Sequence, residues 1–350
     1  MSSPENTSIS SIIKSRFKFF LEVIIIFLGL FIALLIPYYI VPSDSPFYGI
    51  LYFSMRVPII FIMIPILLYV SNFILQPERG QVIVEEEISA SKGYINLFKI
   101  TAKNWKYQLL YAILLLFLIF IPLDFFTYLF VPNMLNYSAQ SLLNSQLNSY
   151  LEFNNYFIFL IFVIVIQLSV AFYEESFARG FIAYRGKDYF HIVSAVLISS
   201  LFFGFGHFAY IFSFNQSGPS YPVSYPLIWF IETFFVGIIL AVFFLRKKWI
   251  WPLIISHAVN NIISAHAIWN YIHGNSFILM TFVYIPLLIG SVILFIYYFK
   301  VIKSAISTGI TFLKSYFKVK EKESKVNIVV RLIFDILIAF LIFAIGTIIA

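Results

Sequence analysis

The sequence predicts an all-α fold, a polytopic bundle of membrane-spanning helices with its N-terminus inside. Three observations predict it. Hydrophobic residues make up 61% of the 350 residues and charged residues 11%, and the mean hydropathy is +0.94, which is too apolar for a soluble protein. The apolar residues gather in runs long enough to cross ~30 Å of hydrocarbon. Along the chain, loops that contain Lys or Arg alternate with loops that contain neither.

The apolar runs predict nine transmembrane helices, or eight if one run does not cross. Basic residues precede the first run, as in a signal peptide, but the run is too long and lacks a small-residue cleavage site. We therefore interpret it as a retained first span. The nine runs lie at 19–41, 48–76, 108–131, 155–183, 190–213, 225–245, 249–270, 277–299 and 328–349.

The loops between the runs fix the orientation, because cytoplasmic loops carry the excess of Lys and Arg. This pattern places the N-terminus inside and the C-terminus outside. We expect 77–107 to be a solvated connector and 132–154 to lie along the outer interface. The basic segments are the N-terminus, 77–107, 184–189, 246–248 and 300–327, whereas 42–47, 132–154, 214–224 and 271–276 contain no Lys or Arg.

Charge and cysteine content exclude several classes of function. The net charge of +7 is spread over short loops and forms no basic stripe, so we expect no nucleic-acid partner. The absence of cysteine excludes thiol nucleophiles, disulfides and thiolate metal sites. Any metal would need His, carboxylate or amide ligands.

Six charged residues inside or near the apolar runs have a structural explanation. An ionised side chain at mid-bilayer costs about 2.5–3.5 kcal/mol on insertion scales, so each needs a partner or a polar surrounding. Near span ends we favour snorkelling or a helix–helix hydrogen bond. Arg331 and Asp335 are four residues apart and are expected to neutralise each other. The six are Glu22, Arg56, Asp124, Glu232, Arg331 and Asp335.

A cluster of charges directly follows the fourth run and is harder to explain structurally. Glu175 and Arg179 share a helix face at i,i+4 and can pair. Glu174 is turned about 100° away from them and has no local counter-charge. A desolvated carboxylate without a counter-charge suits general-base chemistry. The alternative is that these charges merely end the fourth helix at the cytoplasmic boundary.

Two of the five histidines lie inside apolar runs with companions at helical spacing. His207 follows Phe203 by four residues, and His257 precedes Asn261 by four. A single membrane histidine is more often a satisfied core residue. Two of them, together with Asn261 and the acidic cluster on a third helix, favour one convergent polar cavity.

The three motifs together resemble the CAAX prenyl protease and bacteriocin-processing (CPBP, Abi-like) family of intramembrane proteases. The motifs EExxxR, FxxxH and HxxxN correspond to Glu174-Glu175-xxx-Arg179, Phe203-xxx-His207 and His257-xxx-Asn261. The resemblance covers about 170–265 by motif and extends by helix pattern over 105–300. It divides the chain into an N-terminal two-helix region with its connector (1–104), a catalytic helix bundle (105–300) and a basic linker with a C-terminal transmembrane helix (301–350).

The resemblance implies an endopeptidase that hydrolyses a peptide bond near the membrane surface. Glu174 would activate water, and His257 with Asn261 would stabilise the oxyanion. His207 would orient the water, shuttle a proton or bind a metal, and Arg179 would anchor Glu175. The implied substrate is a peptide or a lipidated peptide, the surrounding partner is membrane lipid, and the implied location is the cell membrane.

The cofactor stays open at this point. Glu174, His207 and His257 make a plausible zinc set with an open fourth position. The helical His-Glu-x-x-His spacing is absent, and members of the family are described both as metalloproteases and as metal-free glutamate enzymes.

Two other functions are compatible with the same residues. In a proton-coupled transporter the carboxylates and histidines would form a proton relay, but the sequence shows no internal repeat. A non-catalytic scaffold or immunity protein would share the fold, although all the polar residues that the family requires are present. The protease is the favoured interpretation.

Overall fold

The computed structural model describes residues 8–75, 89–131, 133–143, 145–209, 222–274, 277–317 and 325–349. Every regular element in these ranges is helical, so the predicted all-α fold is confirmed. The α-helices are α1 (Ile9–Ile40), α2 (Tyr48–Leu75), α4 (Ala90–Asn96), α5 (Trp105–Leu115), α6 (Ile121–Phe130), α7 (Met134–Leu143), α8 (Tyr156–Glu175), α9 (Tyr184–Tyr189), α10 (Ile192–Phe208), α12 (Ser224–Lys247), α13 (Trp251–Ile272), α14 (Phe277–Tyr297), α15 (Phe299–Phe317) and α16 (Lys325–Ile349). Two π-helical segments, Leu116–Phe120 and Ser176–Ala183, and a 3₁₀ helix, Gln146–Glu152, complete the set.

The protein is an integral membrane protein, but the predicted count of nine spans is not reached. Within the described residues six helices are long and apolar enough to cross a bilayer, or seven if the bent pair α14–α15 is one span. α10 has only 17 residues, which is short for a span. α13 is long enough, but its histidine, asparagine and serine side chains lower its hydropathy. α10 and α13, which are too short or too polar to count as spans, therefore carry two of the three predicted motifs, FxxxH and HxxxN.

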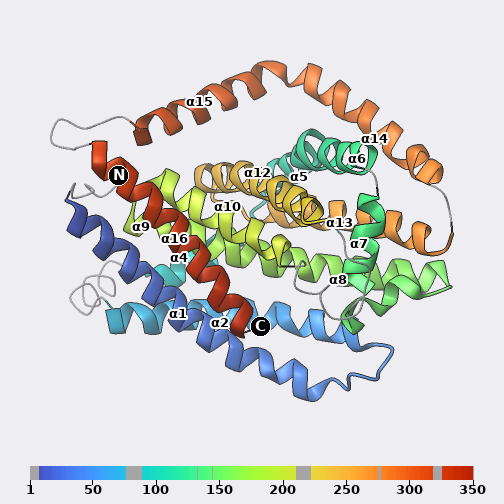
Figure 1. The fold of residues 1–350 in the computed structure, drawn as a ribbon, viewed down its shortest axis with the longest axis horizontal. Coiled ribbons are helices and arrows are strands. Elements are labelled where there is room, and N and C mark those ends of the chain that lie inside the picture. The colour runs from blue at the N-terminus through green and yellow to red at the C-terminus, as the bar shows by residue number, and fades with distance from the viewer. Residues whose placement is uncertain are drawn as a thin grey trace.

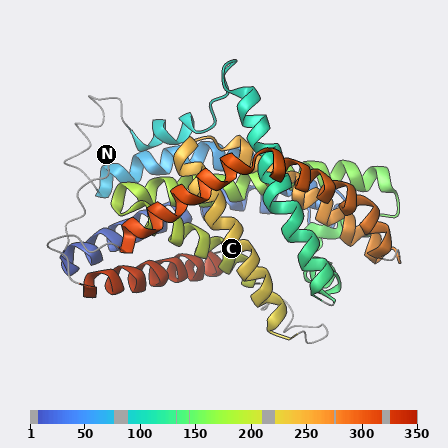
Figure 2. The same cartoon turned by 90° about the horizontal axis from the view of Figure 1, so that it is seen from above.

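The helices form a bundle with a central layer flanked on both sides. α1, α2 and α16 lie on one side, α14 and α15 arch over the other, and α8, α10 and α13 run between them (Figure 1). α5, α6 and α12 are steeply inclined to this layer (Figure 2). α10 packs most extensively on α12, and α13 packs on α8. One continuous apolar core links residues from α1, α8, α13 and α16.

The two long polar loops pack into the bundle more closely than expected. Tyr94 in the connector is fully buried, and the Trp251 indole Nε1 donates to the carbonyl oxygen of Phe98 at 2.9 Å. The structure describes the connector from residue 89 onward. The outer loop folds into α7 and the 3₁₀ helix, and its Tyr137 and Tyr150 are buried. In both segments these apolar side chains pack on neighbouring helices, the connector on α2 and the outer loop on α13.

The expected pairing of Arg331 with Asp335 is also wrong. Asp335 on α16 pairs with Arg16 on α1, with 3.0 Å between Nε and Oδ1. Arg331 instead donates to the carbonyl oxygen of Tyr316 at the end of α15. Tyr316 donates its hydroxyl to Asp335 at 3.0 Å. These charges therefore fasten α1, α15 and α16 together, because a partner on another helix approaches more closely than the neighbour on the same one.

The first part of the predicted basic linker, directly after α14, is helical. Residues 299–317 form α15, which is bent by 77° relative to α14. This helix carries Lys300, Lys303 and Lys314, and most of its apolar side chains are exposed.

Candidate active site

The acidic cluster lies at the junction of α8 with the π-helical segment that follows it. Glu175 Oε1 accepts a hydrogen bond from Arg179 Nη1 at 3.0 Å, and both side chains are fully buried. The predicted i,i+4 pair is thus confirmed. The remaining guanidinium surface of Arg179 lies over the ring of Phe203, with 4.1 Å from Cζ to the ring centroid. The Glu175–Arg179 pair therefore lies between the end of α8 and Phe203 of α10.

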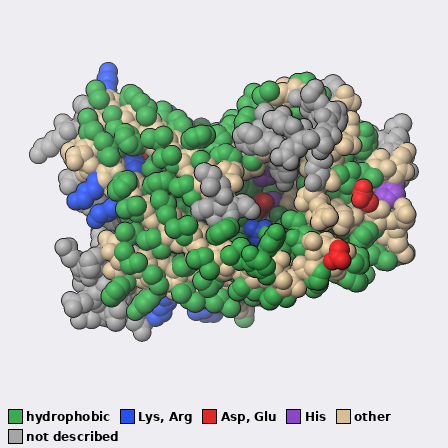
Figure 3. Space-filling model, turned by 60° about the horizontal axis from the view of Figure 1, so that its bottom comes forward, with side chains coloured by type: hydrophobic (Ala, Val, Ile, Leu, Met, Phe, Trp, Pro, Cys, Tyr) green, Lys and Arg blue, Asp and Glu red, His purple; other side chains and the backbone are tan. Residues whose placement is uncertain are grey.

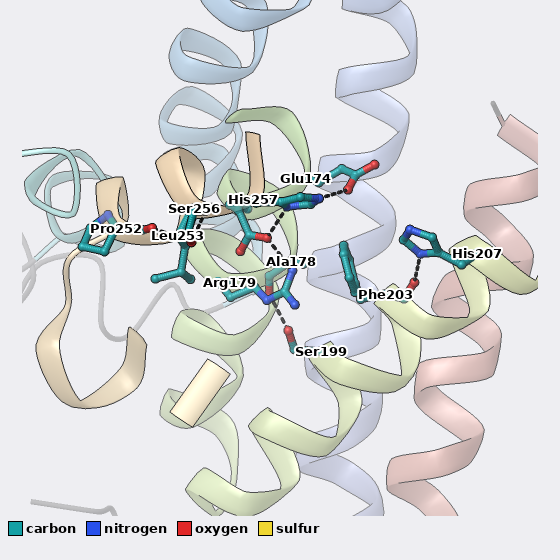
Figure 4. A network of polar contacts seen from close by, with 11 residues as sticks. Glu174, Ala178, Arg179, Ser199, Phe203, His207, Pro252, Leu253, Ser256 and His257 are labelled. Carbon is teal, nitrogen blue, oxygen red and sulfur yellow. Dashed lines mark hydrogen bonds and ion pairs between the residues drawn. The ribbon is translucent and has the colours of Figure 1, made fainter. Parts of the chain in front are cut away.

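His257 connects this ion pair to the second glutamate. Its Nδ1 lies 2.8 Å from Glu175 Oε1, and its Nε2 lies 3.6 Å from Glu174 Oε2 (Figure 4). An ionised carboxylate can only accept, so Nδ1 donates to Glu175. This bond fixes the ring orientation and directs Nε2 toward Glu174. The Glu174 side chain is 28% exposed, whereas Glu175 is fully buried.

Phe203 stands between the two histidines. Its ring centroid is 4.9 Å from that of His207 and 5.9 Å from that of His257, and Figure 4 shows the ring between them. His207 Nδ1 lies 3.0 Å from the carbonyl oxygen of Phe203. Since a carbonyl can only accept, Nδ1 carries the hydrogen and Nε2 is left free. The FxxxH motif therefore orients the histidine through its own helix backbone.

Four of the six predicted site residues line one cavity of about 390 Å³, namely Glu174, His207, His257 and Asn261. They come from α8, α10 and α13, as the motif pattern predicted. Glu175 and Arg179 do not line it and lie behind its wall. Figure 3 shows a hollow in a largely apolar face, with acidic, basic and histidine side chains visible inside it.

The cavity also contains residues that the sequence reasoning set aside. Arg56 on α2, Asp124 on α6 and Glu232 on α12 line it, as does Asn260 beside Asn261. All three face the cavity, and Asp124 on α6 also makes the expected helix–helix hydrogen bond, since it accepts from Ser264 on α13. Their signal was available, since each is an ionisable residue inside an apolar run. Glu22 likewise makes the expected interhelical contact, with Arg185 Nε 3.0 Å from its Oε2.

The three candidate metal ligands do not converge. Glu174, His207 and His257 form no group that could hold a metal ion, and the same is true of every other set of three His, Asp or Glu residues in the described chain. The Phe203 ring lies between the two imidazoles and separates them.

Comparison with known proteins agrees with the motif analysis. Residues 156–263 match the family model described as "Type II CAAX prenyl endopeptidase Rce1-like". This segment contains α8, α10, most of α13 and all six predicted site residues. The family resemblance is thereby confirmed for this part of the chain. Neither the curated proteins nor the solved structures give a significant match.

Proposed function

We propose that this protein is an intramembrane endopeptidase, similar to the CAAX proteases, that hydrolyses a peptide bond near the surface of the cell membrane. The observation that carries the proposal is the meeting of Glu174 and His257 at the wall of a cavity inside a lipid-facing bundle. The family match over the same helices supports a protease. The substrate is a peptide or a lipidated peptide.

In the proposed reaction Glu174 acts as the general base. Its carboxylate takes a proton from a water molecule, and the hydroxyl oxygen forms a bond to the carbonyl carbon of the scissile amide. Negative charge then develops on the carbonyl oxygen. When the C–N bond breaks, Glu174 returns the proton to the leaving amine, so no proton is gained or lost overall.

His257 and Asn261 are the proposed oxyanion donors. Nδ1 of His257 is held by Glu175, so an imidazolium ring offers its Nε2 hydrogen to the cavity beside Glu174. The Asn261 amide lines the same cavity. One such donor contributes about 10²–10³ in kcat, because it is oriented before charge develops. His207, which lines the same cavity, is proposed to orient the water or to shuttle a proton.

Glu175 and Arg179 are proposed as positioning residues. They lie behind the cavity wall and act through His257 and Phe203. Arg179 compensates the charge of the buried Glu175 carboxylate, which in turn holds Nδ1 of His257.

The substitution Glu174→Gln tests the function. In purified protein reconstituted into liposomes, we expect peptide cleavage to fall by at least about 10²-fold, since general-base catalysis contributes ~10²–10⁴. The matched control is Glu152→Gln, which removes the same charge from an exposed position outside the cavity. Retained cleavage by Glu174→Gln contradicts the proposal. Proton-coupled flux lost in that variant would indicate a transporter, and partner binding without any cleavage by the wild type would indicate a scaffold.

A further inference from the structure

The catalytic cavity holds two acidic residues that the proposed reaction does not use. Asp124 on α6 and Glu232 on α12 both line it. Asp124 accepts a hydrogen bond from Ser264 and lies near Asn260, both on α13. The two carboxylates are close enough to interact electrostatically with each other. Three helices therefore direct acceptor groups to one place.

No Lys or Arg among the described residues forms an ion pair with either carboxylate. Arg56 lines the cavity, but its guanidinium lies over the ring of Tyr173 at 4.2 Å. The predicted outer loops also supply no basic partner for these carboxylates, since 132–154, 214–224 and 271–276 contain no Lys or Arg.

A buried amide oxygen at the same place independently lacks a partner. Asn260 is only 6% exposed, lines the cavity, and its Oδ1 has no hydrogen-bond donor. Leaving a buried acceptor unpaired costs about 1–3 kcal/mol. The hydroxyl of Tyr284 is also buried, and it lies close to Asp124. The cavity thus holds two carboxylates and, in its wall, an amide oxygen without a donor. A ligand with a positive charge and several N–H donors would match this set of acceptors.

We propose that Asp124, Glu232 and Asn260 form a subsite that binds a cationic side chain, lysine or arginine, of the peptide substrate. The inference rests on the proposed function, because the subsite shares its cavity with Glu174 and His257. A volume of about 390 Å³ falls within the range of ligand pockets, ~300–1,000 Å³, and has room for side chains on both sides of a scissile bond. Peptides with lysine or arginine near the cleaved bond are therefore preferred over peptides with an uncharged residue there.

The test measures binding separately from cleavage. Immobilised Glu174→Gln protein is mixed with an equimolar library of decapeptides in which each position carries lysine, arginine, norleucine, glutamine or glutamate, and retained peptides are identified by mass spectrometry. Norleucine matches the lysine chain without its charge. We expect lysine and arginine to be enriched over norleucine at one position by about tenfold or more, as for close charge pairs in other interfaces. Retention of no peptide, or equal retention of lysine and norleucine, overturns the inference.

Substitutions in the same background assign the preference to the subsite. Asp124→Asn with Glu232→Gln removes both charges at constant shape, and the enrichment should disappear. The control Asp44→Asn with Glu152→Gln removes two exposed carboxylates and should leave it unchanged. A second variant, Glu232→Lys, should shift the preference toward glutamate at that position. Enrichment of lysine that survives the neutral pair and the reversed charge refutes the subsite.

Cleavage of the same library by protein with an intact Glu174 separates the two proposals. If this protein cleaves peptides without regard to charge, the subsite is wrong and the protease stands. If lysine peptides bind selectively but Glu174→Gln does not reduce cleavage, the subsite stands and the proposed mechanism is wrong.

Discussion

At the scale of single residues, the site depends on a chain of contacts that begins outside the cavity. Arg179 holds Glu175, Glu175 holds Nδ1 of His257, and Nε2 of His257 then faces Glu174. Only the last two residues of this chain border the cavity. The buried ion pair is therefore interpreted as a device for orienting an imidazole, since a buried pair by itself is weak support for stability.

The substitution Glu175→Gln tests this chain. It leaves a buried guanidinium without its carboxylate, which destabilises by about 3–5 kcal/mol. The amide oxygen of the substituted side chain can still accept a hydrogen bond from Nδ1 of His257, so substrate binding should be preserved and KM should change little. It has no negative charge to stabilise the His257 imidazolium, so we expect kcat to fall. Unfolding in a denaturing detergent series and kinetics at a permissive temperature measure the two effects.

A double substitution provides the control. Arg179→Met combined with Glu175→Gln removes both charges and should recover much of the lost stability without recovering kcat. Full recovery of kcat in the double variant would contradict a positioning role for Glu175.

At the scale of elements, irregular helix turns place groups around His257. The π-helical segment Ser176–Ala183 begins directly after Glu175 and contains Arg179. The π-helical segment Leu116–Phe120 ends at Phe120, whose ring stacks on His257 with 5.8 Å between centroids. A π-turn inserts an extra residue and so redirects the side chains around it, which explains its frequency at functional sites.

The contact of α10 with α12 depends on Gly204. A Cβ atom there would lie 3.1 Å from ring carbons of Phe230 and 3.2 Å from the Phe230 carbonyl oxygen. Gly206, two residues further, has nothing within 4 Å of the corresponding position. The two glycines thus differ in function although both precede His207.

Substitution of these glycines gives a matched pair. Gly204→Ala should lower the free energy of unfolding by about 1–3 kcal/mol, because the Phe230 backbone cannot move away. Gly206→Ala should be neutral or slightly stabilising, since alanine favours a helix by ~1 kcal/mol. Thermal unfolding in detergent compares them, and equal shifts in Tm would contradict the close packing of α10 on α12.

At the scale of the whole molecule, the charge pattern predicts on which side the site opens. The cavity is lined by Ser138 and Leu142 of α7 and by Asn148 of the 3₁₀ helix. These residues belong to a loop without Lys or Arg, which the pattern places outside. We therefore expect the substrate to enter from the outer side.

Cysteine labelling tests the orientation cleanly, because the chain contains no cysteine of its own. Glu152→Cys and Lys92→Cys each place a thiol at an exposed position, on the predicted outer and inner side respectively. A membrane-impermeant maleimide should label Glu152→Cys in intact cells, and Lys92→Cys only after lysis. The opposite result would reverse the topology and the side of substrate entry.

Much of the site could be predicted because its signals are local. EExxxR, FxxxH and HxxxN are helical spacings, and charged or histidine residues inside apolar runs are conspicuous. The role of Asp124 and Glu232 could not be predicted, because each is isolated in its own run. They come together only where α6 and α12 meet the same cavity.

The sequence by itself determined the class of the protein, its apolar helices and the residues available for chemistry, because hydropathy and i,i+4 spacing are properties of the chain. The tertiary structure alone decided which charges meet. Arg331 and Asp335 satisfy the spacing of a local pair, yet Asp335 binds Arg16 more than three hundred residues away. In the low-dielectric interior of the bundle a buried charge pairs with the opposite charge that lies closest to it. Tertiary packing decides which charge that is, and local sequence spacing does not predict it.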